Sequence, residues 1–179
     1  MGDVRLLDWS SATAAGEAID WDDVYREQLP RIYNFFRYRV LDRATAEDLT
    51  SITFEKAWRA RDRYRQDRAA FGTWLFTVAR NVAVDHFRSA RPTVSLEEVE
   101  HLPGGPTPEE LAERRSDAER LGRLLARRTD RDRELLALKY GAECTNRDIA
   151  RLTGLSESNV GTILHRAVEG LRADWDEGA

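Results

Sequence analysis

The chain has 179 residues, of which 41% are hydrophobic and 34% are charged, and its formal net charge is −4 at pH 7. This length and composition permit one domain of ordinary size or two small ones, with small cores under charge-rich surfaces. The sequence excludes a disulfide within the chain, because Cys144 is its single cysteine, and it has no apolar run near the roughly 20 residues that span a bilayer.

The first 61 residues predict a tail and two helices. Residues 1–19 are small, polar and aperiodic and lack the basic and apolar segments of a secretory signal, so we expect a flexible tail on a cytoplasmic protein. The apolar periodicity predicts a helix over residues 20–40, within which Pro30 implies a kink or a division. Thr45 opens an acidic variant of the capping box and predicts a second helix over residues 45–61.

An arginine-rich segment follows at residues 59–91. It holds eight arginines and three aspartates, a net charge of +5 in an otherwise acidic chain. Its second part, residues 71–91, predicts a third helix with an apolar face that includes Trp74 and Leu75 and a later half that is polar and basic. Such an island can attract phosphates in a salt-sensitive way, although a merely solvated helix surface is the commoner explanation of a charge run.

The stretch ARPTVSLEEVEHLPGGPTPEE is the main break in the chain, because four of the five prolines lie there. We interpret residues 92–110 as an interdomain linker that few contacts cross. The predicted domains are residues 20–91 and residues 111–175, and residues 176–179 form a short tail.

Two helices are predicted directly after this break. Thr107, Pro108 and Glu110 give a cap, a first-turn proline and a capping-box acid for a helix that runs to about residue 128. Asp130 begins another helix, which ends at Gly141. No strand-like alternation persists anywhere in the sequence, so the expected fold is all-α, with two small helical domains joined by a flexible linker.

The last stretch, TNRDIARLTGLSESNVGTILHRAVEGLRADW, predicts a helix-turn-helix. Thr145 can cap a short helix, Gly154 provides the positive-φ position of a tight turn, and Ser156 can cap a second helix. In this motif the second helix enters the major groove of DNA. An ordinary helical hairpin is the alternative.

Taken together, these features resemble bacterial RNA polymerase sigma factors of the extracytoplasmic function (ECF) type, in the sigma-70 family. The resemblance covers about Val24 to Trp175 and is carried by AEDLTSITFEKAW, by DRYRQDRAAFGTWLFTVARNVAVDHFRSAR and by the helix-turn-helix. Their order is that of the family's region two, a variable linker and region four. The resemblance implies a sigma factor that binds core polymerase and directs promoter-specific initiation, without catalytic residues, cofactor or metal.

The resemblance also implies where the polymerase binds. Region two would contact the clamp helices of the largest subunit, and region four the flap of the second-largest subunit. The implied region-two contacts combine carboxylates and apolar side chains: Glu47, Asp48, Leu49, Phe54 and Trp58. For at least one of the two aromatic residues we expect a core position instead. The chain has Ser51 and Ile52 where the family often has Gln-Glu.

Contacts with the minus-ten element are implied for the arginine-rich segment. The loop DRYRQDR resembles the one that captures a flipped base, and an aromatic ring beside arginines suits an unstacked base. The implied residues are Tyr64, Arg65, Arg80, Asn81, Asp85, Arg88 and Arg91. We assign Trp74 to the core, while His86 fits either role.

Contacts with the minus-thirty-five element are implied for the second helix of the helix-turn-helix: Ser156, Ser158, Asn159, Thr162, His165 and Arg166. The family commonly has a basic residue where this chain has Gly161, and often arginine where it has Ile163. Losing a bidentate guanine contact removes about 1–3 kcal/mol of discrimination, so we expect a readout that depends more on DNA shape and phosphates.

Two other functions compete with this interpretation. A stand-alone helix-turn-helix regulator would explain the two C-terminal helices, but it would leave the region around Tyr64 and Asn81 without a role. A helical enzyme has little support, because the sequence shows no phosphate-binding glycine loop, metal cluster or activated nucleophile. The resemblance adds promoter DNA and an anti-sigma factor, held between the two domains, to the expected partners.

Overall fold

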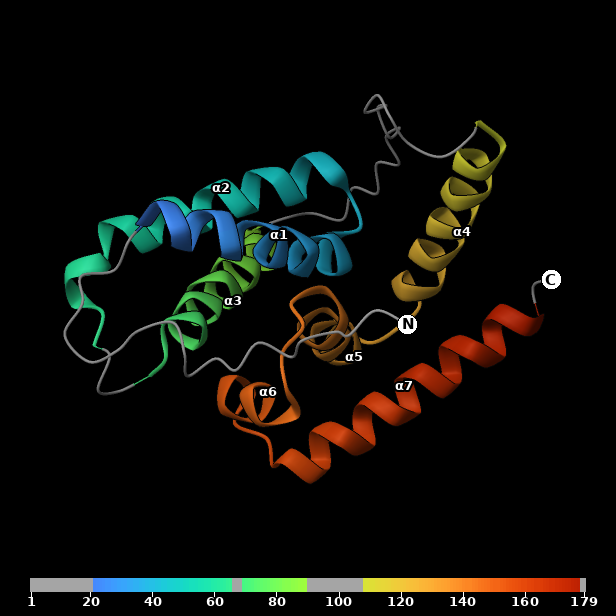
Figure 1. Ribbon diagram of the computed structural model, residues 1–179. Coiled ribbons are helices and arrows are strands. Elements are labelled where there is room, and N and C mark those ends of the chain that lie inside the picture. Colours follow the sequence, from blue (N-terminus) through green and yellow to red (C-terminus); the bar gives the residue numbers. More distant parts are fainter. Residues whose placement is uncertain (1–20, 66–68, 90–107, 178–179) are drawn as a thin grey trace, which may run out of the picture.

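The computed structural model describes residues 21–65, 69–89 and 108–177, and for residues 108–115 it describes the backbone alone (Figure 1). Within these ranges every regular element is a helix, and the helices form one group before residue 90 and one after residue 107. The predicted N-terminal tail, Arg91 and most of the predicted linker lie outside the described residues. None of the described helices is long and apolar enough to cross a membrane.

The N-terminal domain consists of α1 (Trp21–Val40), α2 (Arg43–Arg59), the short 3-10 helix η1 (Arg61–Arg63) and α3 (Phe71–Ser89). The three long helices pack on one another around side chains with no exposed surface: Ile32, Phe35, Phe36, Leu75 and Phe76. Because α1 runs unbroken from Trp21 to Val40, Pro30 does not divide it.

The turn between α1 and α2 differs from the prediction by three residues. Leu41 adopts a φ of 64°, which ends α1 abruptly, and Asp42 then caps α2 by accepting a hydrogen bond from the Thr45 amide at 2.7 Å. Thr45 therefore lies inside the first turn of α2 and is not its cap. Left-handed backbone is uncommon outside glycine, so the sequence carries no direct signal for this turn.

The C-terminal domain consists of α4 (Pro108–Ala126), α5 (Asp130–Leu136), η2 (Ala137–Gly141), α6 (Asn146–Thr153) and α7 (Glu157–Glu177). The helix predicted from Asp130 to Gly141 is present as α5 with a final π-helical turn, η2. The long α7 contacts α4, α5 and α6, and it continues into the predicted C-terminal tail (Figure 1).

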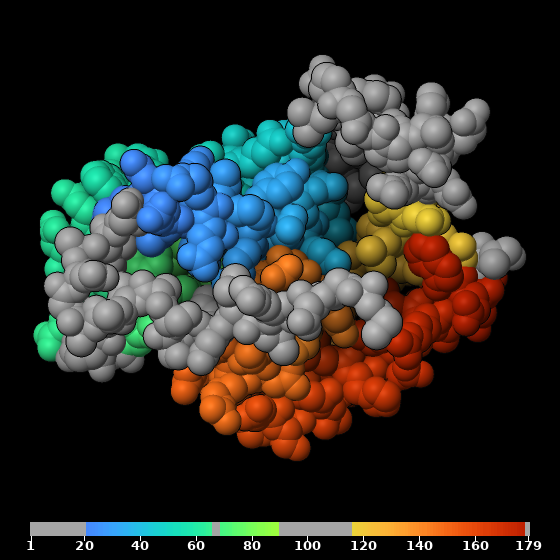
Figure 2. Space-filling view, viewed as in Figure 1, coloured from blue at the N-terminus to red at the C-terminus, as the bar shows by residue number. Residues whose placement is uncertain are grey.

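The two domains pack directly against each other, which differs from the expectation that few contacts join them. Helix α1 contacts α5 and η2, and α3 contacts α6. Figure 2 shows blue residues of α1 against orange residues of the C-terminal domain. The buried residues of both domains form a single core cluster. The sequence did not reveal this interface, because its residues are about 50 to 110 positions apart in the chain.

Candidate nucleic-acid interface

Tyr64 is held at the end of η1 by an aromatic cluster. Its ring centroid lies 5.3 Å from that of Phe71 and 5.2 Å from that of Trp74. Its hydroxyl donates a hydrogen bond to the Ala69 carbonyl oxygen at 3.1 Å, and partial burial raises the pKa of the phenol. The ring is half-buried, so it is fixed in position and still has accessible surface. A fixed aromatic ring with accessible surface can stack on an unpaired base.

Exposed arginines lie beside Tyr64 in the chain. Arg61, Arg63 and Arg65 are exposed, and the Arg61 guanidinium lies 4.3 Å from the centroid of the Trp58 ring. Trp74, which we assigned to the core, is half-buried and packs on both Tyr64 and Phe71. Aromatic and basic side chains therefore meet at one end of the N-terminal domain, as in sites that bind single-stranded nucleic acid.

Three predicted minus-ten residues share the exposed side of α3. Asn81, Asp85 and Arg88 are exposed and follow one another at helical spacing. Asp85 pairs with Arg88 at 3.2 Å and with Lys56 of α2 at 3.5 Å. These are solvent-exposed ion pairs of small energy, so a phosphate can replace the carboxylate at little cost.

Arg80, also predicted to contact the minus-ten element, lies on the side of α3 that faces the C-terminal domain. Its Nε is 2.9 Å from a carboxylate oxygen of Glu134, and its Nη1 donates to the Leu152 carbonyl oxygen. Its side chain is 23% exposed, and both partners belong to the C-terminal domain. In this arrangement Arg80 does not join Asn81 and Asp85 on the exposed face, because one residue along a helix turns the side chain by about 100°.

The helix-turn-helix has the predicted local geometry. Thr145 and Asp148 form a reciprocal capping box at the start of α6, and Gly154 ends that helix with a φ of 75°. The Asn159 amide donates to the Ser156 hydroxyl at 3.2 Å, so Ser156 caps α7 as predicted. The predicted minus-thirty-five side chains are all exposed: Ser156, Ser158, Asn159, Thr162, His165 and Arg166.

The burial of Ile163 corrects the sequence-based comparison that placed it where the family often has a DNA-contacting arginine. Ile163 is 9% exposed and belongs to the core with Val160 and Leu164, so it does not occupy a base-facing position. Gly161, in contrast, is half-buried, and a β-carbon there would lie 3.7 Å from Asn146 Nδ2, an ordinary contact. Of these two positions that differ from the family, Gly161 is therefore the one where a basic side chain could change the readout.

Two arginines of α6 were not predicted from the sequence. Arg147 and Arg151 have side chains 71% and 63% exposed, and each makes only a long ion pair, to Glu157 at 3.9 Å and to Asp148 at 3.8 Å. The first helix of a helix-turn-helix crosses the DNA backbone, so its exposed arginines suit phosphate contacts. In the sequence, the spacing of four residues between these two arginines on one predicted helix was the signal that could have identified them.

The predicted polymerase-binding helix presents a mixed surface. Glu47 and Asp48 are exposed, Trp58 is 49% exposed, and Phe54 is half-buried against Tyr25 with ring centroids 4.8 Å apart. Of the two aromatic residues, Phe54 is thus closer to a core position. A shallow groove of about 420 Å³ runs beside Glu47, lined by residues of α1 and α2.

Leu49, which was also predicted to contact the polymerase, is buried. Its side chain is 5% exposed and belongs to the core of the domain. A partner cannot reach it without unpacking α2 from its neighbours, so Leu49 supports the helix and does not contribute contact surface.

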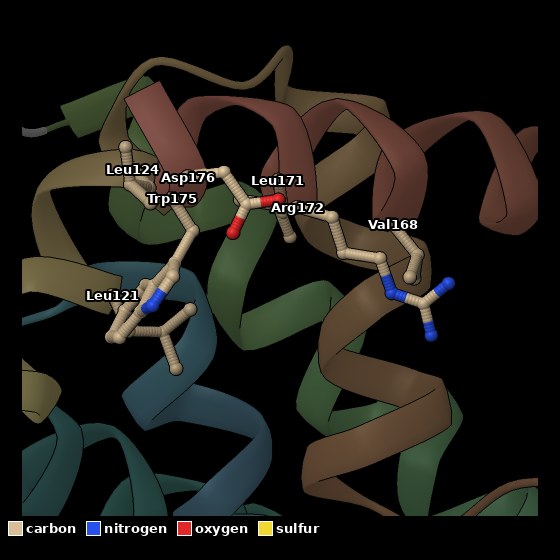
Figure 3. Close-up of a pocket in the computed structure, with 7 residues that line it drawn as sticks. All are labelled: Leu121, Leu124, Val168, Leu171, Arg172, Trp175 and Asp176. Carbon is tan, nitrogen blue, oxygen red and sulfur yellow. The ribbon is translucent and has the colours of Figure 1, made fainter. Parts of the chain in front are cut away.

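A second groove lies between α4 and the end of α7 (Figure 3). It has a volume of about 410 Å³ and is mostly apolar, with Leu121, Leu124, Val168, Leu171 and Trp175 among its lining residues. The Arg120 guanidinium lies 4.2 Å from the centroid of the Trp175 ring at its edge. Among the described residues no group of three or more His, Cys, Asp and Glu side chains is arranged to hold a metal ion.

Comparison with known proteins gives two family matches. Residues 24–93 match sigma-70 region 2, and residues 118–171 match sigma-70 region 4. The ECF RNA polymerase sigma factor SigL of Mycobacterium tuberculosis is 30% identical over 169 residues, covering 93% of this chain and 95% of SigL. The ECF RNA polymerase sigma factor BldN of Streptomyces coelicolor is 32% identical over 175 residues, covering 93% of this chain, which spans 64% of BldN.

The same fold occurs in a solved structure. The sigma factor RpoE of Bartonella quintana, in complex with the anti-sigma factor NepR, aligns with a TM-score of 0.68 at 20% identity. The alignment covers 86% of this chain and 95% of that one. The two-domain helical architecture is therefore shared with that structure.

Proposed function

The chain belongs to the ECF type of the sigma-70 family, and we propose that it binds core RNA polymerase and directs initiation at a specific set of promoters. The observation that carries this proposal is the presence of both a region 2 and a region 4 match, in that order, on one chain. The first domain offers the Tyr64 cluster to opened DNA, and the second offers α7 to duplex DNA. A stand-alone regulator would need only the second.

For region 2, the exposed face of α2 supports polymerase docking. Glu47 and Asp48 can pair with basic side chains of the clamp helices, and Trp58 offers an exposed apolar surface. Rim charges guide association and register, while buried aromatic anchors contribute most of the affinity. We therefore expect Trp58 to contribute more to affinity than either carboxylate.

For the minus-ten element, Tyr64 would receive a flipped base while exposed side chains hold the opened strand. Base stacking on an aromatic ring contributes about 1–3 kcal/mol, which partly compensates for the cost of unstacking. Arg65 and Arg88 would neutralise phosphates, and Asn81 has donor and acceptor groups that can recognise a base edge.

For the minus-thirty-five element, α7 would lie in the major groove. Thr162, His165 and Arg166 would face bases or phosphates, and Arg147 and Arg151 would contact the adjacent backbone. Arg166 pairs with Asp132 only at 3.9 Å and is 76% exposed, so DNA could recruit it readily.

The apolar groove between α4 and α7 suits a helical segment of the polymerase flap (Figure 3). In this proposal the polymerase performs the chemistry, and the chain acts beside it in the cytoplasm without catalysis of its own. The anti-sigma partner of the Bartonella quintana protein supports proposing an inhibitor of that class here, which co-purification from the native cell would test.

The decisive experiment mixes the purified chain with core polymerase and measures binding and promoter-dependent transcription. We expect binding that Trp58→Ala and Asp48→Lys each weaken, because both residues lie on the exposed face of α2. Asp62→Lys makes the same charge change on exposed η1, away from the α2 face and the groove between α4 and α7, and serves as the matched control for binding. Tight binding to duplex DNA alone, with no affinity for core, would favour the stand-alone regulator instead.

A further inference from the structure

The N-terminal ends of α1 and α3 and the C-terminal end of α2 meet in a group of aromatic rings around Phe71. Phe71 is the first residue of α3 and is only 6% exposed. Its ring centroid lies 5.3 Å from those of Tyr64 and Trp74 and 5.6 Å from that of Trp21. Tyr64 and Trp21 each meet Phe71 edge to face, with the ring planes at 77° and 84°. The ring proposed to stack on a flipped base therefore packs on a residue that Trp21 also contacts.

Trp21 has a second ring contact, with Trp58 near the end of α2. The two ring centroids are 5.1 Å apart and the planes are at 83°, again edge to face. Trp21 is the first residue of α1 and is half-buried. Edge-to-face aromatic pairs stabilise their geometry beyond the contribution of the buried area alone. Trp21 therefore joins α1 to both neighbouring helices at the end of the domain that carries Tyr64.

The segment that leads to Tyr64 is folded onto Trp58. Arg61 is the first residue of η1, and its guanidinium lies 4.3 Å from the centroid of the Trp58 ring. Its Nη1 also donates a hydrogen bond to the Trp58 carbonyl oxygen at 2.9 Å. The amide of Tyr64 in turn donates to the Arg61 carbonyl oxygen at 3.1 Å. The position of Tyr64 at the end of η1 therefore depends on the position of Trp58.

Tyr64 thus has two supports, and Trp21 contacts both of them. One is the ring of Phe71, on which the tyrosine ring packs, and the other is the ring of Trp58, on which η1 is folded. Replacing Trp21 by a small residue would leave a space beside both rings. Neighbouring side chains relax only partly into such a space, and the rings that line it lose dispersion contacts on that side. The Tyr64 ring would then sample more orientations, and fewer of them would suit stacking on a base.

We propose that Trp21 is a positioning residue for base capture: through Phe71 and Trp58 it holds the ring of Tyr64 in the orientation that stacks on the flipped base. This inference rests on the proposed function, in which Tyr64 receives that base. Trp21 precedes residues 24–93, the range that matches sigma-70 region 2, so the family match does not assign it a role. The role follows from its ring contacts with two helices.

Tyr25 provides a matched control, one helical turn further along α1. Its ring centroid lies 4.8 Å from that of Phe54, so it also joins α1 to α2 through an aromatic pair. Phe54 and Trp58 are likewise one turn apart on α2. Tyr25→Ala therefore removes an aromatic pair from the same two helices and leaves the contacts of Trp21 with Trp58 and Phe71 in place.

The test measures how strongly the full-length chain, bound to core polymerase, distinguishes an intact strand from one that lacks a base. The probe is a single strand carrying the minus-ten element of a promoter that the wild-type protein opens, compared with copies in which one base at a time is removed to leave an abasic sugar. At the captured position the wild-type complex should bind the intact strand about 5- to 150-fold more tightly, the range expected for one stacked base.

This ratio of affinities should fall several-fold toward one in Trp21→Ala. Trp21→Phe keeps an aromatic edge and should restore the ratio, and Tyr25→Ala should leave it at the wild-type value. Because a ratio of two affinities does not depend on the fraction of active protein, a general loss of stability does not imitate this result. Circular dichroism and melting curves establish that each variant is folded.

A second measurement follows Tyr64 in the free chain. Nitration by tetranitromethane, located by peptide mass spectrometry, reports the accessibility of each tyrosine ring. Trp21→Ala should raise the nitration of Tyr64 several-fold over wild type and over Tyr25→Ala, whereas Tyr140, which is 51% exposed, should react alike in all three proteins.

An unchanged ratio or unchanged nitration of Tyr64 in Trp21→Ala would overturn the proposal, as would an equal loss of the ratio in Tyr25→Ala. A wild-type complex that binds intact and abasic strands equally at every position would instead contradict base capture in the proposed function. The nitration of Tyr64 would then still decide whether Trp21 holds that ring in place.

Discussion

The guanidinium Nε of Arg80 lies 2.9 Å from Oε1 of Glu134, which links α3 of the N-terminal domain to α5 of the C-terminal domain. Arg80 adjoins Asn81 in sequence, yet the two side chains serve different surfaces. The ion pair separates residues that the sequence grouped as a single DNA-binding face.

Arg80→Ala and Arg88→Ala should therefore have different effects on stability. The Arg80 side chain is 23% exposed and its removal leaves Glu134 without this partner, so we expect a loss of about 1–3 kcal/mol in the free energy of unfolding. Arg88 is 79% exposed, and its loss should cost less than about 0.5 kcal/mol. Urea unfolding followed by circular dichroism measures both, and equal effects would contradict the buried ion pair of Arg80 with Glu134.

Tyr64→Ala and Tyr64→Phe separate the ring from the hydroxyl. Tyr64→Ala removes the stacking surface, so promoter opening should fall by the equivalent of about 1–3 kcal/mol, roughly 5- to 150-fold. Tyr64→Phe loses only the hydrogen bond to the Ala69 oxygen and should retain opening, at a stability cost of about 0.5–1.5 kcal/mol. Permanganate reactivity of unpaired thymines measures opening. Intact opening in Tyr64→Ala would remove the base-capture role.

Leu49→Ala and Asp48→Lys distinguish core from contact surface on α2. Leu49 is 5% exposed, so truncation should cost about 2–5 kcal/mol of folding stability. Asp48 is exposed, so its replacement should change stability by less than about 0.5 kcal/mol while weakening polymerase binding. Melting curves and a core-binding assay on both variants check the assignment, and a destabilised Asp48→Lys would contradict it.

Gly161→Arg tests the readout of the upstream element. The site has room for a β-carbon, so we expect the variant to fold and α7 to gain up to about 1 kcal/mol of helix propensity. The new guanidinium should raise affinity for the upstream element and shift its preferred sequence, by about 1–3 kcal/mol if it reaches a guanine. Selection from a randomised upstream element measures the preference. Gly161→Ala controls for propensity, and an unchanged preference would show that this position does not face the bases.

Cys144 gives the fold a pH dependence in the alkaline range. Burial raises the pKa of its thiol to about 12, whereas an unfolded thiol titrates at about 8.5. Between these values the unfolded chain loses the proton first, so the stabilisation present below about pH 8.5 is lost as pH rises toward 12. The slope for this group is at most about 1.4 kcal/mol per pH unit.

Cys144→Ala isolates this contribution from the tyrosines, because Tyr38 and Tyr64 also have raised pKa values and remain in both proteins. Chemical unfolding from about pH 7 to about pH 11 should show wild-type stability falling more steeply than that of the variant. Parallel curves would mean that the thiol is accessible to water in the folded chain.

Local signals in the sequence predicted the elements of the candidate site well. The predicted cap at Thr145, turn at Gly154 and cap at Ser156 are all present, because each depends on residues within four positions of one another. The start of α2 was missed, since Leu41 adopts a left-handed conformation without being glycine.

Which side a residue faces was harder to predict. Ile163 was compared with DNA-facing positions of the family, yet it is buried, and Leu49 was assigned to a partner although it belongs to the core. A helix turns about 100° per residue, so an error of one position changes the face. Resemblance to a family does not fix this register where a neighbouring element decides what is covered.

The sequence by itself determined where the long helices lie, the caps of the helix-turn-helix and the family, because short-range hydrogen bonds and apolar periodicity depend on residues close together in the chain. Only the tertiary structure decided that the domains meet, that Gly141 lies against the Asn34 backbone, and that Arg31 reaches the Ala142 oxygen, 111 positions away. These contacts depend on the relative placement of packed domains. Closing so long a loop costs entropy that only many simultaneous contacts can offset. No local sequence pattern encodes the combined free energy of those contacts.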